Sequence, residues 1–509
     1  MNAAEPIYKP SLALLTDLYQ LTMAYGYWKL ARADDQAVFH LTFRKHPFKG
    51  GYTLACGLEN AVAFVNAFHY DAGDIAYLAS LTGNDGKALF EPDFLVYLSG
   101  LRLTCDIDAM PEGTAVFPHE PLVRVKGPLL QCQLLETPLL NMLNFQSLIA
   151  TKAARICWAA GGESVLEFGL RRAQGVDGSL GASRAAYIGG CSATSNVLAG
   201  RLYGIPVKGT HAHSWVMCFD EELEAFDAYA TALPNNCIFL VDTYDTLEGV
   251  RNAIEIGRRL RRRGHEMLGI RLDSGDLAYL SVEARAMLDE AGFDKAIIVG
   301  SNDLDENIIA SLKQQEARIS VWAVGTRLVT AYDEPALGGV YKLSAIKRPG
   351  GEWQHKVKLS EQSVKTTTPG ILQVRRFFGP SGADGRRGGQ FTADMIFDEL
   401  SGVGVPPARS AGVSPAGAVI VDMKDPTRRK IIPAGTPYED LLVPVFRAGK
   451  CVYDSPAPAD IRRRAQEQLA GLHKGIKRFL NPHEYPSGLE KGLHDLKTQL
   501  ILEARGLPV

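Results

Sequence analysis

The sequence predicts an α/β protein, built from an α+β sandwich domain, a parallel α/β barrel and a small helical appendage at its C-terminus. The chain has 509 residues, which is too long for one ordinary hydrophobic core. Its 46% hydrophobic and 22% charged residues are typical of a globular protein. From about residue 137, strand-like and helix-like segments alternate, as they do in βα units. These observations predict domains at 1–136 plus 335–445, at 137–334, and at 446–509.

The first domain mixes helices with short strands. A helix is expected within 11–30, beginning near Thr16 or Asp17. Residues 37–45 alternate apolar and polar side chains, which indicates a strand, and 58–68 has a helical pattern. Residues 101–131 are strand-rich but interrupted by proline and glycine. Later β-like stretches at 352–376 and 415–433 are expected to return to this domain's sheet.

The central domain opens with a long helix over 137–160. Its strand candidates are short apolar runs, spaced by roughly the length of one βα unit. They are 164–169, 186–189, 205–208, 237–241, 267–272, 295–299 and 319–324. Seven such units predict a TIM-like parallel barrel, closed or nearly closed.

Composition excludes several classes of protein. The net charge is −2, so the chain is not built to bind the phosphate backbone of a nucleic acid. No run of about 18 apolar residues is present, so no membrane span is expected. None of the eight cysteines forms a C-x-x-C pair, and reduced thiols fit a cytoplasmic protein.

Polar residues follow the expected barrel strands. The carboxyl ends of parallel strands share one rim, so these side chains are expected to converge. Capping of the next helix explains about half of the polar residues at these strand ends, but not Arg171, His213, Arg271 or the pair Asp273 and Asp276. The rim residues are Phe168, Arg171, Thr210, His213, Asp242, Arg271, Asp273, Ser301, Asn302, Gly325 and Thr326.

These residue types favour anionic substrates. Arg171 and Arg271 can each bind a carboxylate or phosphate with two hydrogen bonds. The stretches 301–302 and 325–326 offer backbone N–H groups near helix starts, which suit phosphate. Asp242 and Asp273 are candidate ligands for Mg²⁺. The rim therefore predicts a phosphorylated, magnesium-bound substrate together with a smaller anion.

Two histidines lie in the stretch 209–214 (GTHAHS), before a helix expected over 215–231 with Ser214 as its N-cap. His211 and His213 resemble the paired zinc ligands of barrel metallohydrolases, but the other nine histidines do not follow later strands. His211 can instead be a packed structural residue. His213, beside phosphate-binding groups, can be a nucleophile that forms a phosphohistidine.

Six sequence blocks resemble the nicotinate phosphoribosyltransferase family, in particular its bacterial-type members within the type II phosphoribosyltransferases. They are 14–20 (LLTDLYQ), 167–172 (EFGLRR), 209–214, 271–276 (RLDSGD), 337–343 (LGGVYKL) and 477–483 (KRFLNPH). The resemblance implies the joining of nicotinate to phosphoribosyl pyrophosphate (PRPP), the first step of NAD salvage from nicotinate. It also implies ATP hydrolysis through a phosphohistidine, hence a ligase with ATP as co-substrate and Mg²⁺ as cofactor.

The resemblance also implies roles for individual residues. The catalytic residues would be His213, which would carry the phosphate, Asp273 and Arg271. Nicotinate would contact Tyr19, Phe168, Arg171, Thr210 and Arg271, with Tyr19 supplied by the partner subunit of a homodimer with shared sites. PRPP would contact Arg171, Asp242, Ser301, Asn302, Gly325 and Thr326, with Mg²⁺ held by Asp242 and Asp273.

Substrate choice turns on one charge. By the same resemblance, relatives that use nicotinamide carry an aspartate in the segment that corresponds to 194–196, and this chain has no acid there. A carboxylate at that place would repel nicotinate, so nicotinate is favoured. The alternatives are a nicotinamide-using enzyme, a barrel metallohydrolase using His211 and His213, and an inactive nucleotide-binding homologue.

Overall fold

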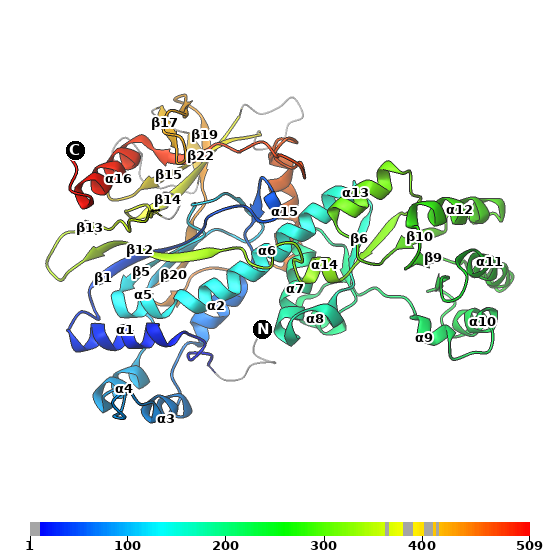
Figure 1. The fold of residues 1–509 in the computed structure, drawn as a ribbon, viewed down its shortest axis with the longest axis horizontal. Helices are drawn as coiled ribbons and strands as arrows, with labels where there is room; N and C mark the ends of the chain where they lie inside the picture. Colours follow the sequence, from blue (N-terminus) through cyan, green and yellow to red (C-terminus); the bar gives the residue numbers. More distant parts are fainter. Residues whose placement is uncertain (1–10, 362–365, 380–389, 402–410, 414–416, 509) are drawn as a thin grey trace. The chain divides into compact units, whose positions relative to one another are not determined.

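The chain folds into two compact units. The structure is a computed structural model that describes residues 11–361, 366–379, 390–401, 411–413 and 417–508. Unit 1 comprises Met1–Leu148 and Ala336–Val509, and unit 2 comprises Ile149–Pro335. Unit 2 is the green part of Figure 1 beyond the middle of α6 (Glu136–Ala160). None of the described helices combines the length and the apolar character needed to cross a membrane.

Unit 1 contains a seven-stranded antiparallel sheet. Its order is β13 (Gln354–His355), β12 (Gly339–Lys347), β1 (Gln36–Phe43), β5 (Val123–Pro128), β3 (Asp106–Ala109), β20 (Val443–Arg447) and β21 (Lys450–Cys451). β2 (Thr53–Leu54) and β4 (Ala115–Val116) pair separately. β1 pairs with β12 and β5, which confirms the predicted strand at 37–45.

The N-terminal helices also lie near their predicted places. α1 (Leu18–Lys29) has Asp17 as its N-cap, and the Gln20 side chain accepts a hydrogen bond from the Asp17 backbone N–H at 2.9 Å. Such reciprocal capping fixes the start of a helix. The other helices of this region are α2 (Leu58–Ala67), α3 (Ala72–Ser80), α4 (Pro92–Gly100), α5 (Leu129–Leu134) and α6 (Glu136–Ala160).

A second seven-stranded sheet follows in the C-terminal part of unit 1. Its order is β16 (Ala411–Val413), β19 (Pro437–Asp440), β14 (Leu372–Phe378), β15 (Phe391–Asp398), β22 (Ser487–Glu490), β17 (Ala418–Asp422) and β18 (Arg429–Ile432). The prediction that 352–376 and 415–433 join the first sheet is therefore wrong except for β13. A helical appendage over 446–509 is not confirmed: α15 (Pro458–Gly471) and α16 (Lys491–Ala504) are helices, but β22 lies inside this sheet.

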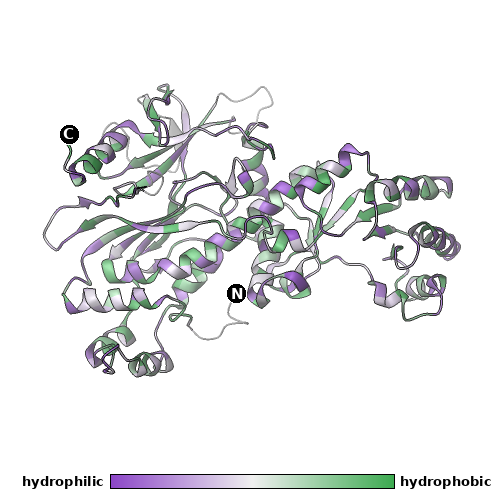
Figure 2. Cartoon of the chain, in the orientation of Figure 1, coloured by the Kyte–Doolittle hydropathy of each residue, from purple (hydrophilic) through white to green (hydrophobic). Residues whose placement is uncertain are grey.

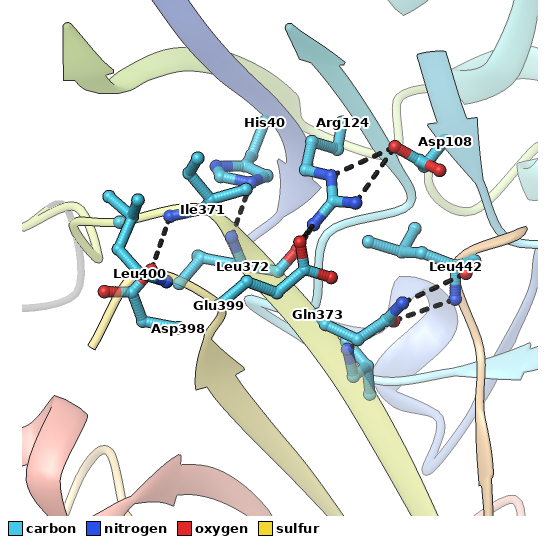
Figure 3. A network of polar contacts seen from close by, with 12 residues as sticks. His40, Asp108, Arg124, Ile371, Leu372, Gln373, Asp398, Glu399, Leu400 and Leu442 are labelled. Carbon is cyan, nitrogen blue, oxygen red and sulfur yellow. Dashed lines mark hydrogen bonds and ion pairs between the residues drawn. The ribbon is translucent and has the colours of Figure 1, made fainter. Parts of the chain in front are cut away.

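A polar network ties the two sheets of unit 1 together (Figure 3). Arg124 of β5 forms ion pairs at 3.0 Å with Asp108 of β3 and with Glu399, which follows β15. His40 of β1 accepts a hydrogen bond from the Leu372 backbone N–H at 3.2 Å. Burial lowers the pKa of His40 to about 3, which keeps its ring neutral and able to accept this bond.

Unit 2 is a parallel sheet of six strands (Figure 1). The order is β7 (Ala193–Thr194), β6 (Ser164–Glu167), β11 (Val321–Val324), β10 (Ile297–Gly300), β9 (Gly269–Leu272) and β8 (Ile238–Leu240). Helices alternate with these strands: α7 (Gly175–Gly189), α8 (Val197–Tyr203), α9 (His213–Val216), α10 (Glu222–Ala232), α11 (Thr246–Arg262), α12 (Leu277–Glu290), α13 (Glu306–Gln314) and α14 (Thr326–Val329).

The helices of unit 2 are amphipathic, as surface helices over a sheet should be. Figure 2 shows α11 as a mainly hydrophilic helix with scattered hydrophobic residues. Its apolar side chains Val250, Ile254 and Leu260 are nevertheless buried, while Arg258 and Arg262 are exposed. The arginines of α11 therefore lie on the solvated face of a packed helix.

The parallel α/β arrangement is confirmed, but barrel closure is not. β7 and β8 are the edge strands, and no ladder between described strands joins them. The expected strand at 205–208 contributes one isolated bridge, between Val207 and Thr194. Closure requires the two edge strands to pair with each other, and the spacing of strands along a sequence does not show whether they do.

Two local predictions in unit 2 are wrong. Residues 186–189 form the end of α7 rather than a strand, because a short apolar run looks the same in either structure. The helix expected over 215–231 is broken into α9 and α10, and Ser214 lies inside α9 instead of capping it. Apolar residues continue at helical spacing across the break, so periodicity does not reveal it.

Candidate active site

The parallel sheet brings its polar strand ends to one edge. Arg271 of β9 lies in register between Leu240 of β8 and Val299 of β10. Asp273 follows β9 directly, and Ser301 follows β10 directly. Neighbouring parallel strands end on the same side, so these groups meet although they are far apart in sequence.

Arg271 is the centre of the site. Its Nη2 donates to Asp273 Oδ1 at 2.7 Å, its Nε to Ser301 Oγ at 2.9 Å and its Nη1 to Thr210 Oγ1 at 3.2 Å. The side chain is 14% exposed. Three segments of the chain thus fix one guanidinium, which confirms that Thr210, Arg271, Asp273 and Ser301 converge. A cation held rigidly at low exposure is well suited to bind an anion.

Asp273 is an ionised carboxylate with several donors. Burial acts to raise its pKa, but the hydrogen bond from Ser301 and the positive charge of Arg271 outweigh burial and hold the pKa below its usual value. Its backbone N–H donates to Asp242 Oδ2 at 2.9 Å. Its Oδ2 lies 3.8 Å from His213 Nε2. Asp273 therefore connects the arginine, the second aspartate and the histidine.

His213 is the more reactive of the two histidines by geometry. Its Nδ1 lies 3.1 Å from Thr243 Oγ1, which orients the ring, and its Nε2 faces Asp273. The side chain is 39% exposed, so a ligand can reach it. An imidazole oriented on one nitrogen and open on the other is the arrangement that a nucleophilic histidine needs.

His211 has a structural role. Its Nε2 accepts a hydrogen bond from the Leu240 backbone N–H at 3.2 Å, and its ring packs on Tyr229 with 5.0 Å between centroids. Burial lowers its pKa to about 4, so the ring stays neutral. One of its two ring nitrogens is therefore already occupied. This geometry disfavours the metallohydrolase interpretation, and among the described residues no cluster of three or more His, Cys, Asp or Glu could hold a metal.

Asp242 carries an unsatisfied oxygen. Its Oδ2 accepts hydrogen bonds from the Asp273 N–H and from Ser274 Oγ, the latter at 2.6 Å. Its Oδ1 is buried and has no hydrogen-bond partner among the described residues. A buried carboxylate oxygen without a donor suits a cation or a ligand hydroxyl. Mg²⁺ bound to proteins commonly uses one or two carboxylates plus substrate phosphates, so Asp242 fits such an ion.

Phe168 lies beside the arginine and a cavity. Its ring centroid is 6.0 Å from Arg271 Cζ. Phe168, Gly209 and Thr210 lie at one end of a cavity of about 780 Å³. Most of its described lining comes from residues that precede or begin the strands, such as Ser164, Ile238 and Met267, and Arg271 is not part of it. An aromatic ring next to a fixed guanidinium suits a flat aromatic acid.

The remaining predicted residues differ in their placement. Asn302 is exposed and has a left-handed backbone with φ of 85°. Gly325 is the N-cap of α14, and an added Cβ would lie 3.2 Å from the Phe168 carbonyl oxygen, so the start of α14 lies against Phe168. Arg171 is exposed in a short 3-10 turn and is not among the three hydrogen-bond partners of Arg271. Tyr19 is 47% exposed on α1 of unit 1, and its role stays a prediction.

Sequence reasoning missed two groups of supporting residues. Thr243 and Ser274 hold His213 and Asp242, and both directly follow a residue already singled out. Glu167 is fully buried and accepts hydrogen bonds from Thr194 Oγ1 at 2.5 Å and Ser183 Oγ at 2.8 Å. It thereby holds the segment 194–196 against the residue that precedes Phe168. Glu167 could have been noticed in the sequence, because a charged residue in an otherwise apolar strand indicates a buried hydrogen-bonding role.

Unit 1 carries a small cationic pocket that the sequence did not reveal. Its volume is about 50 Å³, and no carboxylate occurs in the part of its lining that the structure describes. Burial lowers the pKa of Lys497 to about 8, and this residue donates to Thr368 of the lining at 3.1 Å. The cationic side chains of the lining are Arg44, Lys342 and Lys358, and the rings of His40 and His119, whose pKa values burial lowers to about 3 and about 4, are neutral. A cluster of cations without a carboxylate favours an anion.

Unit 2 thus has the features of an α/β enzyme that binds anionic, aromatic and phosphorylated groups at the carboxyl ends of a parallel sheet. Sequence models of the nicotinate phosphoribosyltransferase N-terminal domain, family and C-terminal domain match residues 14–144, 164–379 and 387–497. The chain belongs to the nicotinate phosphoribosyltransferase family, as the sequence blocks indicated.

Similar proteins cover nearly the whole chain. Nicotinate phosphoribosyltransferase of Bacillus subtilis is 43% identical over 498 residues, covering 97% of this chain and 96% of that protein. The Homo sapiens protein of the same name is 37% identical, covering 96% of each. A crystal structure of human nicotinic acid phosphoribosyltransferase matches with a TM-score of 0.80 at 34% identity, covering 95% of this chain and 99% of that one.

Proposed function

We propose that the protein transfers phosphoribosyl from PRPP to nicotinate, forming nicotinate mononucleotide and pyrophosphate in NAD salvage. The observation that carries this function is Arg271, fixed by three partners beside Phe168. The pyridine ring stacks on Phe168 while its carboxylate meets Arg271 and Thr210. Membership of the family supports the same activity.

Nicotinate is favoured over nicotinamide by charge. The segment 194–196 has no acid, and the nearby Glu167 carboxylate is already bonded to Thr194, Ser183 and the Gly169 N–H. Its negative charge is therefore compensated by neighbouring donors. Arg271 is paired with Asp273 but keeps two N–H groups outside its three hydrogen bonds, and these gain more from a carboxylate than from a neutral amide.

The chemistry is a displacement at the anomeric carbon of ribose. The pyridine nitrogen forms the new C–N bond with its own lone pair, so no general base is required. Positive charge grows on the sugar as pyrophosphate leaves, and the carboxylates of Asp242 and Asp273 stabilise it. Asp242 Oδ1 offers a place for Mg²⁺, which would neutralise the leaving pyrophosphate when bound.

The reaction is coupled to ATP through His213. Its Nε2 attacks the terminal phosphorus of ATP, a P–N bond forms, and the P–O bond to ADP breaks. Water later hydrolyses the phosphohistidine. The phosphoryl group changes the local charge by about −2, which reorganises a site that otherwise holds Asp273 close to the ring.

The active unit is a homodimer with shared sites in the cytoplasm. The exposed Tyr19 on α1 supports this proposal, because an exposed aromatic residue can cover a partner's bound ring. The cationic pocket of unit 1 supports it too, since it would suit the phosphates of the same substrates. All eight cysteines are free thiols, in keeping with a reducing compartment.

The direct test supplies purified protein with PRPP, Mg²⁺ and labelled nicotinate or nicotinamide, with and without ATP. We expect nicotinate mononucleotide as product, faster with ATP, and little product from nicotinamide at equal concentration. Equal use of nicotinamide, or no mononucleotide from either compound, would contradict the proposal.

His213→Ala is expected to abolish the stimulation by ATP while leaving a slow, ATP-independent transfer. The substitution removes the phosphate acceptor but not Arg271 or Phe168. Steady-state rates with and without ATP measure the effect, and ³²P transfer from ATP to protein should vanish. His69→Ala is the matched control, because His69 is exposed on unit 1. Full ATP stimulation in His213→Ala would exclude the phosphohistidine.

A further inference from the structure

A second cavity lies in unit 1 and takes no part in the proposed reaction. Its volume is about 800 Å³. It is formed by the β17–β18 hairpin, orange in Figure 1, and by the chain that leads into β22. Part of the block 477–483, which the proposed function leaves unexplained, contributes to its lining.

The charges that face this cavity are mainly positive. Four cationic side chains line it, Arg428, Arg429, Lys430 and Arg478, with two carboxylates, Asp422 and Glu484. Both carboxylates have other partners. Asp422 accepts hydrogen bonds from two backbone N–H groups, at 2.7 and 2.9 Å, and Glu484 forms an ion pair at 2.8 Å with a lysine outside the lining. The cavity therefore retains an excess of positive charge.

Two guanidinium groups are free to bind. Arg429 uses its Nε for the Pro426 carbonyl at 3.4 Å, and Arg478 uses its Nε for the Gly475 carbonyl at 3.2 Å. Neither arginine forms an ion pair with a described residue, and Arg428 has only a 3.7 Å contact with Glu484. Their terminal nitrogens remain available for the two-bond contact that arginine makes with phosphate.

The rest of the wall combines apolar side chains with three polar ones, Asn481, His483 and Ser487. Ile431 is 76% exposed, and Ile420, Pro482 and Pro486 also contribute. Tyr485 is held in place by stacking on a phenylalanine ring at 4.0 Å between centroids. A cavity that joins free guanidinium groups to exposed aliphatic surface fits a ligand with a charged end and a flat apolar end.

We propose that this cavity binds a nucleoside phosphate. The phosphates lie on Arg428, Arg429 and Arg478, and the base covers Ile431 and Pro482. The site lies wholly within unit 1, whereas the transferase residues Arg271 and His213 lie in unit 2. The proposal does not rest on the transferase activity, because it uses none of those residues.

The test is calorimetric titration of the full chain with ADP, and with pyrophosphate, at physiological salt. ADP binding at this cavity should weaken at least about tenfold in Arg429→Glu/Arg478→Glu, because each guanidinium makes charge-assisted hydrogen bonds. Any ADP site in unit 2 should survive that change. Arg429→Ala/Arg478→Ala serves as a second variant if charge reversal disturbs folding.

The matched control reverses two exposed arginines of α11, Arg258→Glu/Arg262→Glu, and should bind ADP as the wild type does. ADP binding unchanged in both cavity variants would overturn the proposal. The proposal would also be overturned if the cavity bound ADP no more tightly than it bound pyrophosphate, because the base would then contribute nothing to the affinity. A protein without transferase activity would still show the cavity site, so the two proposals fail separately.

Discussion

Replacing Arg271 with leucine is expected to lower kcat/KM for nicotinate by about a thousandfold, the size of effect seen when a fixed electrostatic group is removed. The change removes the cation that meets the substrate carboxylate. It also leaves Asp273 without its 2.7 Å partner, so that a second negative charge faces the incoming anion. Steady-state kinetics with varied nicotinate and saturating PRPP and ATP measures the loss.

The Arg271→Lys variant separates charge from geometry. A lysine keeps the positive charge but cannot contact Thr210, Ser301 and Asp273 together, because its ammonium is a single point. We expect it to recover only part of the activity. Arg258→Leu on the exposed face of α11 is the control and should be fully active. A loss of less than about tenfold in Arg271→Leu would remove this residue from the centre of the site.

The second large effect concerns stability. Arg376→Met is expected to destabilise unit 1 by about 3–5 kcal/mol, because it leaves a buried carboxylate without its counter-charge. Arg376 and Asp394 are both fully buried and paired at 2.5 Å. The same guanidinium also donates to Gln468 Oε1 and the Ala115 carbonyl, each at 2.7 Å. One side chain thus joins β14, β15, β4 and α15.

Hydrogen exchange of the β14 and β15 amides measures this loss locally, since unit 1 contains these strands. Protection of these amides should fall sharply in Arg376→Met. The double variant Arg376→Met/Asp394→Leu should recover part of it, because no unpaired charge then remains. Protection equal to the wild type in the single variant would show that the pair contributes little.

The sequence predicted the site better than the complete fold. Arg271, Asp273 and Ser301 follow or end recognisable strands, and parallel pairing of β9 with β10 places them together. That inference needs only the local pattern and the rule that parallel strands end on one side. Closure of the sheet into a barrel depends on whether the edge strands β7 and β8 pair with each other, and no local sequence pattern carries that information.

The two histidines also show what local sequence patterns can predict and what only the folded structure reveals. Spacing alone left three interpretations open for His211 and His213. Burial and partners distinguish the two residues: His211 packs against Tyr229 and accepts from a backbone N–H, while His213 is 39% exposed and its Nε2 lies 3.8 Å from Asp273. The four-residue strand β22 was missed for a similar reason, because a segment that short has no readable periodicity.

The central claim is that distant strand ends of unit 2 form one site for the pyridine, its carboxylate and the ribose phosphate. A crystal structure with nicotinate mononucleotide bound tests it most directly. The account predicts the pyridine ring on Phe168, its carboxylate within hydrogen-bond distance of Arg271 or Thr210, and its phosphate at Gly325–Thr326. A mononucleotide bound elsewhere, with no contact to Phe168 or Arg271, would contradict it.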